Sequence, residues 1–337
     1  MRALEKTIVK PLVFLLIISV LIVNSNRRFL FWDEEAREIV DVLPKDPKQI
    51  PTIYKVSDTE TDYLLDDSMI VGVVVDGASK AYPLMVLDRH EVVNDQIGDT
   101  HIIVSYCPLT NSPLVFTRPK QASFGVSGKL FRNNLVLYDN VSETLWSQIY
   151  MRGIQGEQKD TPLDYHPCNM MRWGEWKRLH PETRLIALPD NFSEEEYMED
   201  SYAEYRASPD PGVFPLKYQD FSVDQKEMML AVTLGDEMKA YPYSALQSER
   251  VISDALGGQE IVVTWFAGSA QAFKAGDRLF VFDKGSWMKA GNGESWDILT
   301  GAMNGSSNRL EPAPCIPLYW FACKEFYPET HVYTLDP

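Results

Sequence analysis

Apolar runs and turn residues alternate along most of the chain, a pattern that predicts many short strands and few helices. Four runs rich in β-branched and aromatic residues are the clearest strand candidates: Ile70–Val75, Thr100–Tyr106, Leu114–Thr117 and Leu135–Tyr138. The clearest helix is Arg172–Leu179, in which Trp173, Trp176 and Leu179 recur on one helical face before Pro181 ends it. Because strands dominate and do not alternate regularly with helices, we expect a strand-rich α+β fold.

Residues 88–116 carry the most promising chemistry, and the centre of this stretch predicts a hairpin. Gly98 and Asp99 are typical of a two-residue hairpin turn, and a β-branched run follows them. If the centre of the turn lies between them, residues whose numbers sum to 197 face each other. His90 and Cys107 meet this condition, so their Cβ atoms should lie roughly 4.5–5.5 Å apart as cross-strand neighbours. A helix over His90–Gln96 would break this pairing.

The pattern around this hairpin returns about 150 residues later. Lys80–Pro83 recurs as Lys239–Pro242, and Ile102–Val104 recurs as Ile261–Val263, both with an offset of 159 residues. Further matches have offsets of 144–150 residues: Leu137–Asp139 with Val281–Asp283, Trp146 with Trp296, Pro167–Cys168 with Pro314–Cys315, Trp173 with Trp320, and Pro181–Thr183 with Pro328–Thr330. A repeat of this length is too long for a solenoid unit and predicts the tandem duplication of one domain.

The repeat divides the folded part of the chain into four segments: a connecting region at residues 29–69, a first copy at 70–190, an acidic linker at 191–225 and a degenerate second copy at 226–337. At the hairpin, the second copy carries Glu249 and Phe266 where the first has His90 and Cys107. Positions that both copies share suggest a common scaffold. The differences therefore place a candidate site in the first copy.

Residues 1–28 have the features of a membrane anchor. Arg2, Lys6 and Lys10 precede the apolar run 11–23, as in the basic and hydrophobic regions of a signal sequence. No A-x-A-like cleavage site follows, and apolar residues before Lys10 lengthen the run toward the roughly 20 residues that span a bilayer. We therefore expect an uncleaved signal-anchor, a transmembrane helix that holds the folded part on the extracytoplasmic side, periplasmic or at the cell surface.

Charge and motifs narrow the functional classes. A net charge of −16 over 337 residues argues against a nucleic-acid partner, because binding a phosphate backbone requires clustered Lys and Arg. The sequence contains no Walker A loop, dinucleotide-binding fingerprint, HExxH or GxSxG motif. Its four cysteines allow three complete disulfide pairings, and the sequence does not select one.

Several motifs resemble a known family. AYPL, HEVVND, SYCPL, FGVSGKL, LVLYD, LWSQ and WGEWKRLHPETR, spread over Ile70–Leu188, are similar to the bacterial and archaeal family DUF3179, a domain of unknown function. The resemblance implies no particular activity. The family pattern often contains CPLC, whereas this chain has Thr110 in place of the second cysteine. This departure argues against a CxxC redox motif or a two-thiolate metal site.

The most specific hypothesis for His90 and Cys107 is a transition-metal site. Imidazole and thiolate together suit such ions, and an extracytoplasmic location favours copper. The third ligand would come from His166, or from His101 or Asp139, although none of these has the spacing of a known metal motif.

Two alternatives remain open. In the first, His90 lowers the pKa of Cys107 so that the thiolate acts as a nucleophile, with Asn94 or Asp95 orienting the imidazole. In the second, the chain is a non-catalytic ligand-binding or protein-interaction module with a structural, buried cysteine. The sequence does not decide whether the protein is an enzyme.

Overall fold

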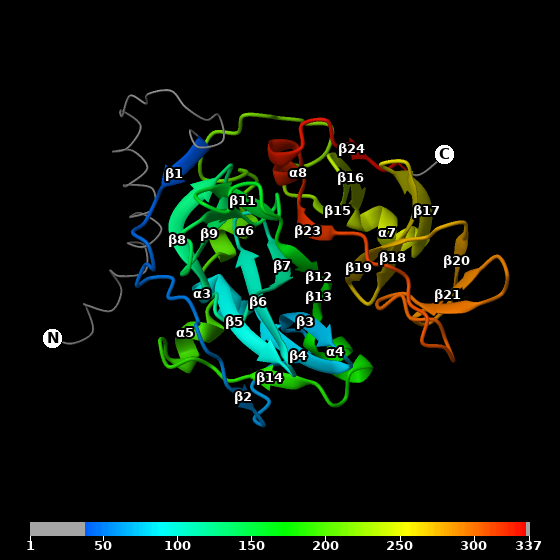
Figure 1. Cartoon of the computed structure of the whole chain (residues 1–337), viewed down its shortest axis with the longest axis horizontal. Coiled ribbons are helices and arrows are strands. Elements are labelled where there is room, and N and C mark those ends of the chain that lie inside the picture. Colours follow the sequence, from blue (N-terminus) through cyan, green and yellow to red (C-terminus); the bar gives the residue numbers. More distant parts are fainter. Residues whose placement is uncertain (1–37, 335–337) are drawn as a thin grey trace.

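The computed structural model describes residues 38–334 and has a strand-rich α+β architecture (Figure 1). The expected membrane anchor lies outside the described residues. Between residues 38 and 334, no helix is both long and apolar enough to cross a membrane. All four strand candidates fall within observed strands, and the expected helix is observed as α4 (Trp173–Leu179).

The first sheet of the N-terminal half has the strand order β13-β3-β4-β14-β2. The strands are β2 (Asp58–Thr59), β3 (Met69–Val75), β4 (Ala78–Pro83), β13 (Cys168–Arg172) and β14 (Arg184–Ile186). All neighbouring pairs are antiparallel except β4 and β14, which are parallel. Strand β3 is apolar along its whole length because both of its faces are covered: Val71 and Val73 pack in one core cluster, and Ile70 packs with Trp176 of α4 in another.

Two further sheets of this half pack face to face. One has the order β12-β7-β6-β5, with β5 (Val92–Ile97), β6 (Thr100–Cys107), β7 (Ser112–Thr117) and β12 (Asp164–His166). The other has the order β1-β8-β9-β10-β11, with β1 (Ile39–Asp41), β8 (Phe124–Phe131), β9 (Asn134–Asp139), β10 (Leu145–Ser147) and β11 (Arg152–Gln155). Ile103 and Phe116 from the first sheet share a core cluster with Leu137 and Trp146 from the second.

The segment between the halves is packed against the first half. Its two short helices are α5 (Glu194–Met198) and α6 (Ala203–Ala207). Ser193 and Glu196 form a reciprocal capping box at the start of α5. Tyr197 of α5 and Tyr205 of α6 are buried, and the Tyr205 hydroxyl donates to the carbonyl of Leu109 at 2.6 Å.

The described part of the C-terminal half, up to residue 334, contains three sheets. The first has the order β23-β15-β16-β24, with β15 (Met228–Leu234), β16 (Glu237–Pro242), β23 (Cys315–Tyr319) and β24 (His331–Val332). The second consists of β17 (Val251–Leu256), β18 (Gln259–Phe266) and β19 (Ser269–Lys274), and the third of β20 (Phe280–Lys284), β21 (Trp287–Ala290) and β22 (Ser295–Asp297). Helix α7 (Tyr243–Glu249) follows β16, and α8 (Trp320–Phe326) follows β23.

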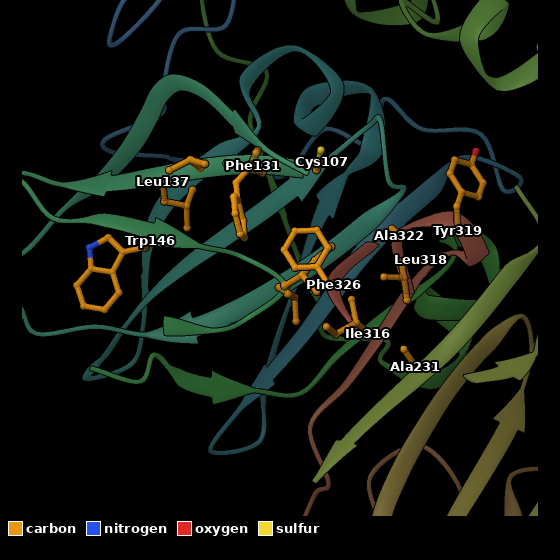
Figure 2. Packing of buried hydrophobic residues seen from close by; sticks show 14 of the residues in the cluster. Cys107, Phe131, Leu137, Trp146, Ala231, Ile316, Leu318, Tyr319, Ala322 and Phe326 are labelled. Atoms are coloured by element: carbon orange, nitrogen blue, oxygen red, sulfur yellow. The ribbon is translucent and has the colours of Figure 1, made fainter. Parts of the chain in front are cut away.

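The two halves share one continuous apolar core. Ile316 and Leu318 of β23 belong to the same cluster as Leu137 of β9 (Figure 2). Phe326 of α8 lies edge-to-face against Phe131 of β8, with ring centroids 5.4 Å apart (Figure 2). Burial of this aromatic and aliphatic surface holds the halves together.

One expected sequence match joins strands with different neighbours. Leu137 of β9 faces Trp146 of β10, whereas Met288 of β21 faces Trp296 of β22. Equivalence of Trp146 and Trp296 would align β9 with β21, whereas the match of Leu137–Asp139 with Val281–Asp283 aligns β9 with β20, so the two matches exclude each other. The similar letters reflect alternating apolar residues that many strands share.

Candidate functional site

The hairpin at the centre of the first half has the predicted turn. Gly98 adopts a φ of 59°, which the turn requires and glycine tolerates. Strands β5 and β6 pair in antiparallel register with Val92 opposite Ser105 and Asn94 opposite Ile103. Each of these pairs sums to 197, so the predicted register is confirmed.

His90 lies outside this ladder, because the chain is helical up to that residue. His90 is the last residue of α3 (Leu84–His90), and Glu91 ends the helix with a φ of 56°. The hydrogen bonds of the hairpin reach Glu91, whose carbonyl accepts from the Tyr106 N–H at 2.8 Å, and stop there. The prediction that His90 is a cross-strand neighbour of Cys107 is therefore wrong, because His90 belongs to α3 and the hairpin pairing ends at Glu91.

The His90 ring is fully buried, and hydrogen bonds engage both of its nitrogens. Nδ1 lies 2.5 Å from the carbonyl oxygen of Pro51, and Nε2 lies 2.7 Å from the hydroxyl of Tyr197. Burial lowers the pKa of His90 to about 4, so the ring is neutral at pH 7, and Nδ1 donates to the Pro51 carbonyl. A metal ion would have to displace one of these partners.

Cys107 lies in a different core cluster from the one around His90. Along β6, Ile103 and Cys107 face the cluster with Phe116, whereas Val104 and Tyr106 face the cluster that contains Tyr197, the partner of His90. The alternation of side chains along a strand explains this separation. The structure thus places the imidazole and the thiol on opposite sides of the sheet.

The Cys107 thiol is 1 % exposed, and its pKa is raised to about 11 by burial and by the nearby Glu91 carboxyl. It therefore stays protonated at neutral pH. The other three cysteines, Cys168, Cys315 and Cys323, are also buried and free, so none of the three disulfide pairings is formed.

The other sequence-predicted ligands have separate structural roles. His166 Nε2 lies 3.0 Å from the carbonyl oxygen of Val74. Asp139 accepts from the Trp146 indole at 3.0 Å and from Ser142. His101 lies on β6 opposite Gln96. Across residues 38–334, no group of three or more His, Cys, Asp or Glu side chains is arranged to hold a metal ion.

Asn94 and Asp95, the residues expected to orient the imidazole, also act elsewhere. Asn94 joins the two facing sheets by accepting from the Phe124 N–H at 2.9 Å and donating to its carbonyl at 2.8 Å. Asp95 pairs with Lys80 at 2.6 Å and accepts from the Tyr82 hydroxyl at 2.7 Å. Both residues stabilise the scaffold.

The sequence did not predict a buried ionisable group beside Cys107, the carboxyl of Glu91. Glu91 is 8 % exposed, and burial together with the nearby Asp88 carboxyl raises its pKa to about 8. Asp88 forms an ion pair with Arg206 of α6 at 2.5 Å, yet burial still raises its pKa to about 6. The sequence does contain an indication of this group: the residue 159 positions after Glu91 is Arg250, so an acidic residue in the first half stands where the second half has a basic one.

A polar network lies inside the first half, next to Cys107. The Thr110 hydroxyl is 2.8 Å from that of Ser112, and Asn134 Nδ2 donates to Thr110 at 2.9 Å and to Gln148 at 2.9 Å. Gln148 in turn donates to the Ser105 hydroxyl at 3.0 Å. Thr110, which replaces a cysteine of the family pattern, is therefore a fully buried member of a hydrogen-bonded network.

One surface cleft is far from these residues in the sequence and is lined by residues of both halves. It has a volume of about 970 Å³ and lies along β16 and β24. Its lining includes Arg152 of β11, Lys239 of β16, His331 of β24 and the rings of Tyr327 and Phe326. The carboxylates of Asp236, Glu237 and Glu329 also line it, so acidic, basic and aromatic side chains meet in one open groove.

Residues 47–330 match a family model described as "Protein of unknown function (DUF3179)". This match covers most of the chain, so the protein belongs to the DUF3179 family. No curated protein and no solved structure matches the chain.

Proposed function

We propose that this DUF3179 protein is a non-catalytic binding module, anchored in a membrane, whose cysteines contribute to packing rather than to chemistry. The observation that carries the proposal is the environment of Cys107, which is buried in apolar core with its pKa raised to about 11. Nucleophilic catalysis and metal binding both require a thiolate. A thiol that stays protonated at neutral pH favours a structural role.

The surroundings of His90 support the same proposal. Its ring nitrogens contact Pro51 and Tyr197, and its lowered pKa keeps it neutral. A histidine that joins a loop, a helix and the inter-half segment by hydrogen bonds has a structural role without any ligand. The groove between the halves, rather than the hairpin, is then where we expect a ligand to bind.

The direct test is whether Cys107 reacts with iodoacetamide while the chain is folded, together with elemental analysis of protein purified without a histidine tag. We expect no reaction of the folded protein and no stoichiometric metal. Copper bound at one equivalent and lost in Cys107→Ser would instead support the metal site.

The membrane anchor is part of this proposal and rests on the basic residues and apolar run of residues 1–23. Full-length protein should sediment with membranes and resist extraction by high salt, since apolar insertion is not screened by ions. A chain starting near Phe31 should stay in the soluble fraction. Recovery of the uncleaved full-length chain in the cytosolic fraction would contradict the anchor.

We also propose that residues 70–190 and 226–337 are two copies of one fold. In both, an antiparallel hairpin is followed directly by a seven-residue helix, α3 or α7, and then by a second hairpin. Lys239 and Tyr241 contact Asp254 as Lys80 and Tyr82 contact Asp95, each residue 159 positions later. The different hairpin ends, His90–Glu91 and Glu249–Arg250, fit a shared scaffold with altered local chemistry.

A further inference from the structure

The two halves differ at one sheet edge. In the first half, β14 lies between β4 and β2, and Leu185 of β14 faces Thr59 of β2 in an antiparallel pair. In the second half, β24 pairs with β16 in the same parallel sense, with His331 opposite Lys239. Within residues 38–334, no strand pairs with the other side of β24, which ends its sheet.

The backbone of β24 has hydrogen-bonding groups directed toward this open side. Tyr333 donates its N–H to the carbonyl of Ala240 on β16 at 2.8 Å. Because successive residues of a strand direct their backbone groups to opposite sides, the N–H and C=O of Val332 point away from β16. Such an edge is a template for an added strand.

In the first half, β2 brings a carboxylate to this edge. Asp58 contacts Lys80 at 2.5 Å and Arg184 at 3.3 Å. Lys80 and Arg184 face each other across β4 and β14, as Lys239 and His331 do across β16 and β24. The second half therefore presents two nitrogen-bearing side chains at the place where the first half binds Asp58.

Exposure of the two lysines reflects this difference. The Lys80 side chain is 6 % exposed beneath β2, whereas that of Lys239 is 25 % exposed. Lys239 contacts Asp254 at 2.5 Å but has no counterpart of Asp58 among its described ion pairs. The groove of about 970 Å³ lies along this edge.

The segment 159 positions after β2 lies against other parts of the molecule. Residues 159 positions after Asp58 and Thr59 are Lys217 and Tyr218. Lys217 pairs with Glu38 at 2.6 Å, and the Tyr218 N–H donates to the carboxylate of Glu325 at 2.6 Å. These contacts keep the segment away from β24.

We propose that the open edge of β24 binds an extended peptide segment of a partner protein as an added antiparallel strand, with an Asp or Glu side chain of the peptide against Lys239 and His331. The proposal names the ligand class of the binding module proposed above and rests on it. Main-chain hydrogen bonds to Val332 would supply affinity, and the carboxylate would set the register.

The probe is a peptide with the sequence of the β2 segment, which pairs with β14 in the first half. A fluorescent peptide with the sequence of residues 55–62, KVSDTETD, is titrated with the full-length protein in detergent, and binding is followed by fluorescence anisotropy. We expect saturable binding. The peptide with Asn in place of the residue derived from Asp58 should bind about ten-fold more weakly, because it loses charge-assisted contacts. N-methylation at the residue derived from Thr59 should abolish binding, since it removes the main-chain donor to Val332.

Variants of the exposed His331 provide the matched protein controls. His331→Arg copies Arg184 of the first half and should tighten binding about two- to five-fold, as expected for an exposed ion pair. His331→Glu should weaken it. Amide hydrogen exchange at Val332 should slow when the peptide binds.

Three results would overturn the proposal: no binding of the probe, binding that ignores both peptide changes, or concentration-dependent dimerisation that His331→Glu abolishes, which would assign the edge to a second copy of the chain. None of them bears on whether Cys107 is reactive, so failure here is distinguishable from failure of the proposed function.

Discussion

At the scale of single residues, burial decides the chemistry of the hairpin. His90 and Cys107 have the right chemical types for a site, but each is enclosed on its own side of β6. The residue types were visible in the sequence. Their burial was not, because it depends on Tyr197 from α5, more than 100 residues away, and on apolar residues of β8 and β9.

Glu91 gives a residue-scale prediction about pH. Its pKa is about 8 in the folded protein, raised from 4.5 by burial and by Asp88, so the folded state holds its proton more tightly than the unfolded chain. The resulting stability is fully present below about pH 4.5 and is lost as the pH rises through 8.

We therefore expect Glu91→Gln, which cannot ionise, to be more stable than the wild type at pH 8. Its free energy of unfolding should be higher by on the order of a few kcal/mol, so that it unfolds at a higher denaturant concentration. The difference should shrink toward pH 5. Denaturation of both proteins across this range measures it, and equal pH dependence of the two would show that Glu91 is ionised in the fold.

At the scale of elements, hydrophobic patterning predicted strands well and helix ends poorly. The runs at Ile70–Val75 and Thr100–Tyr106 were recognised because they are continuous and β-branched. Strand β8 (Phe124–Phe131) was missed, since Gly125 and Gly128 resemble loop residues. Gly128 in fact sits at a bulge with a φ of 75°, where a Cβ would lie 2.2 Å from the Leu43 carbonyl oxygen.

The position of the end of α3, which the sequence did not predict, determines where His90 lies. Helix α3 is only seven residues long and starts at Leu84, directly after Pro83, whose extended conformation belongs to β4. No polar N-cap residue marks its start, and Glu91, a residue that seldom adopts positive φ, marks its end. Tertiary packing therefore determines this helix, and the sequence around it lacks the usual signals.

A matched set of tyrosine variants tests whether the two halves use one scaffold. The Tyr82 hydroxyl donates to Asp95 at 2.7 Å, and that of Tyr241 donates to Asp254 at 2.8 Å. Hydrogen bonds to a charged group contribute about 1.5–3 kcal/mol. Tyr82→Phe and Tyr241→Phe should each lower the free energy of unfolding by about this amount.

Tyr243→Phe is the control, because the buried Tyr243 hydroxyl has no hydrogen-bond partner in the part of the chain that the structure describes. Its removal should be neutral or stabilising. Denaturant titration compares the three variants. Comparable losses in all three would mean that the Asp contacts contribute nothing specific, and the argument for a shared scaffold would lose its strongest support.

At the scale of the whole molecule, the fold buries its reactive residue types and opens a groove at the boundary between the halves. Phe131 and Phe326 close the core there, whereas β24 leaves a sheet edge beside Lys239 and His331. The repeat in the sequence directed attention to the first half, where the copies differ in residue type. The accessible sheet edge is instead formed by β24, with whose outer side no strand pairs within residues 38–334, and no local pattern predicts this.

The central claim, that Cys107 is structural, is tested most directly by alkylation of the folded protein. Iodoacetamide is added at pH 7.5, and labelling at each cysteine is followed by mass spectrometry, with the chain in denaturant as the reference. We expect Cys107 to react at least about a thousand-fold more slowly in the folded protein, at a rate limited by unfolding. If Cys107 is labelled as fast in the folded protein as in the denatured chain, the structural role of Cys107 is contradicted, and the hairpin carries a reactive thiolate.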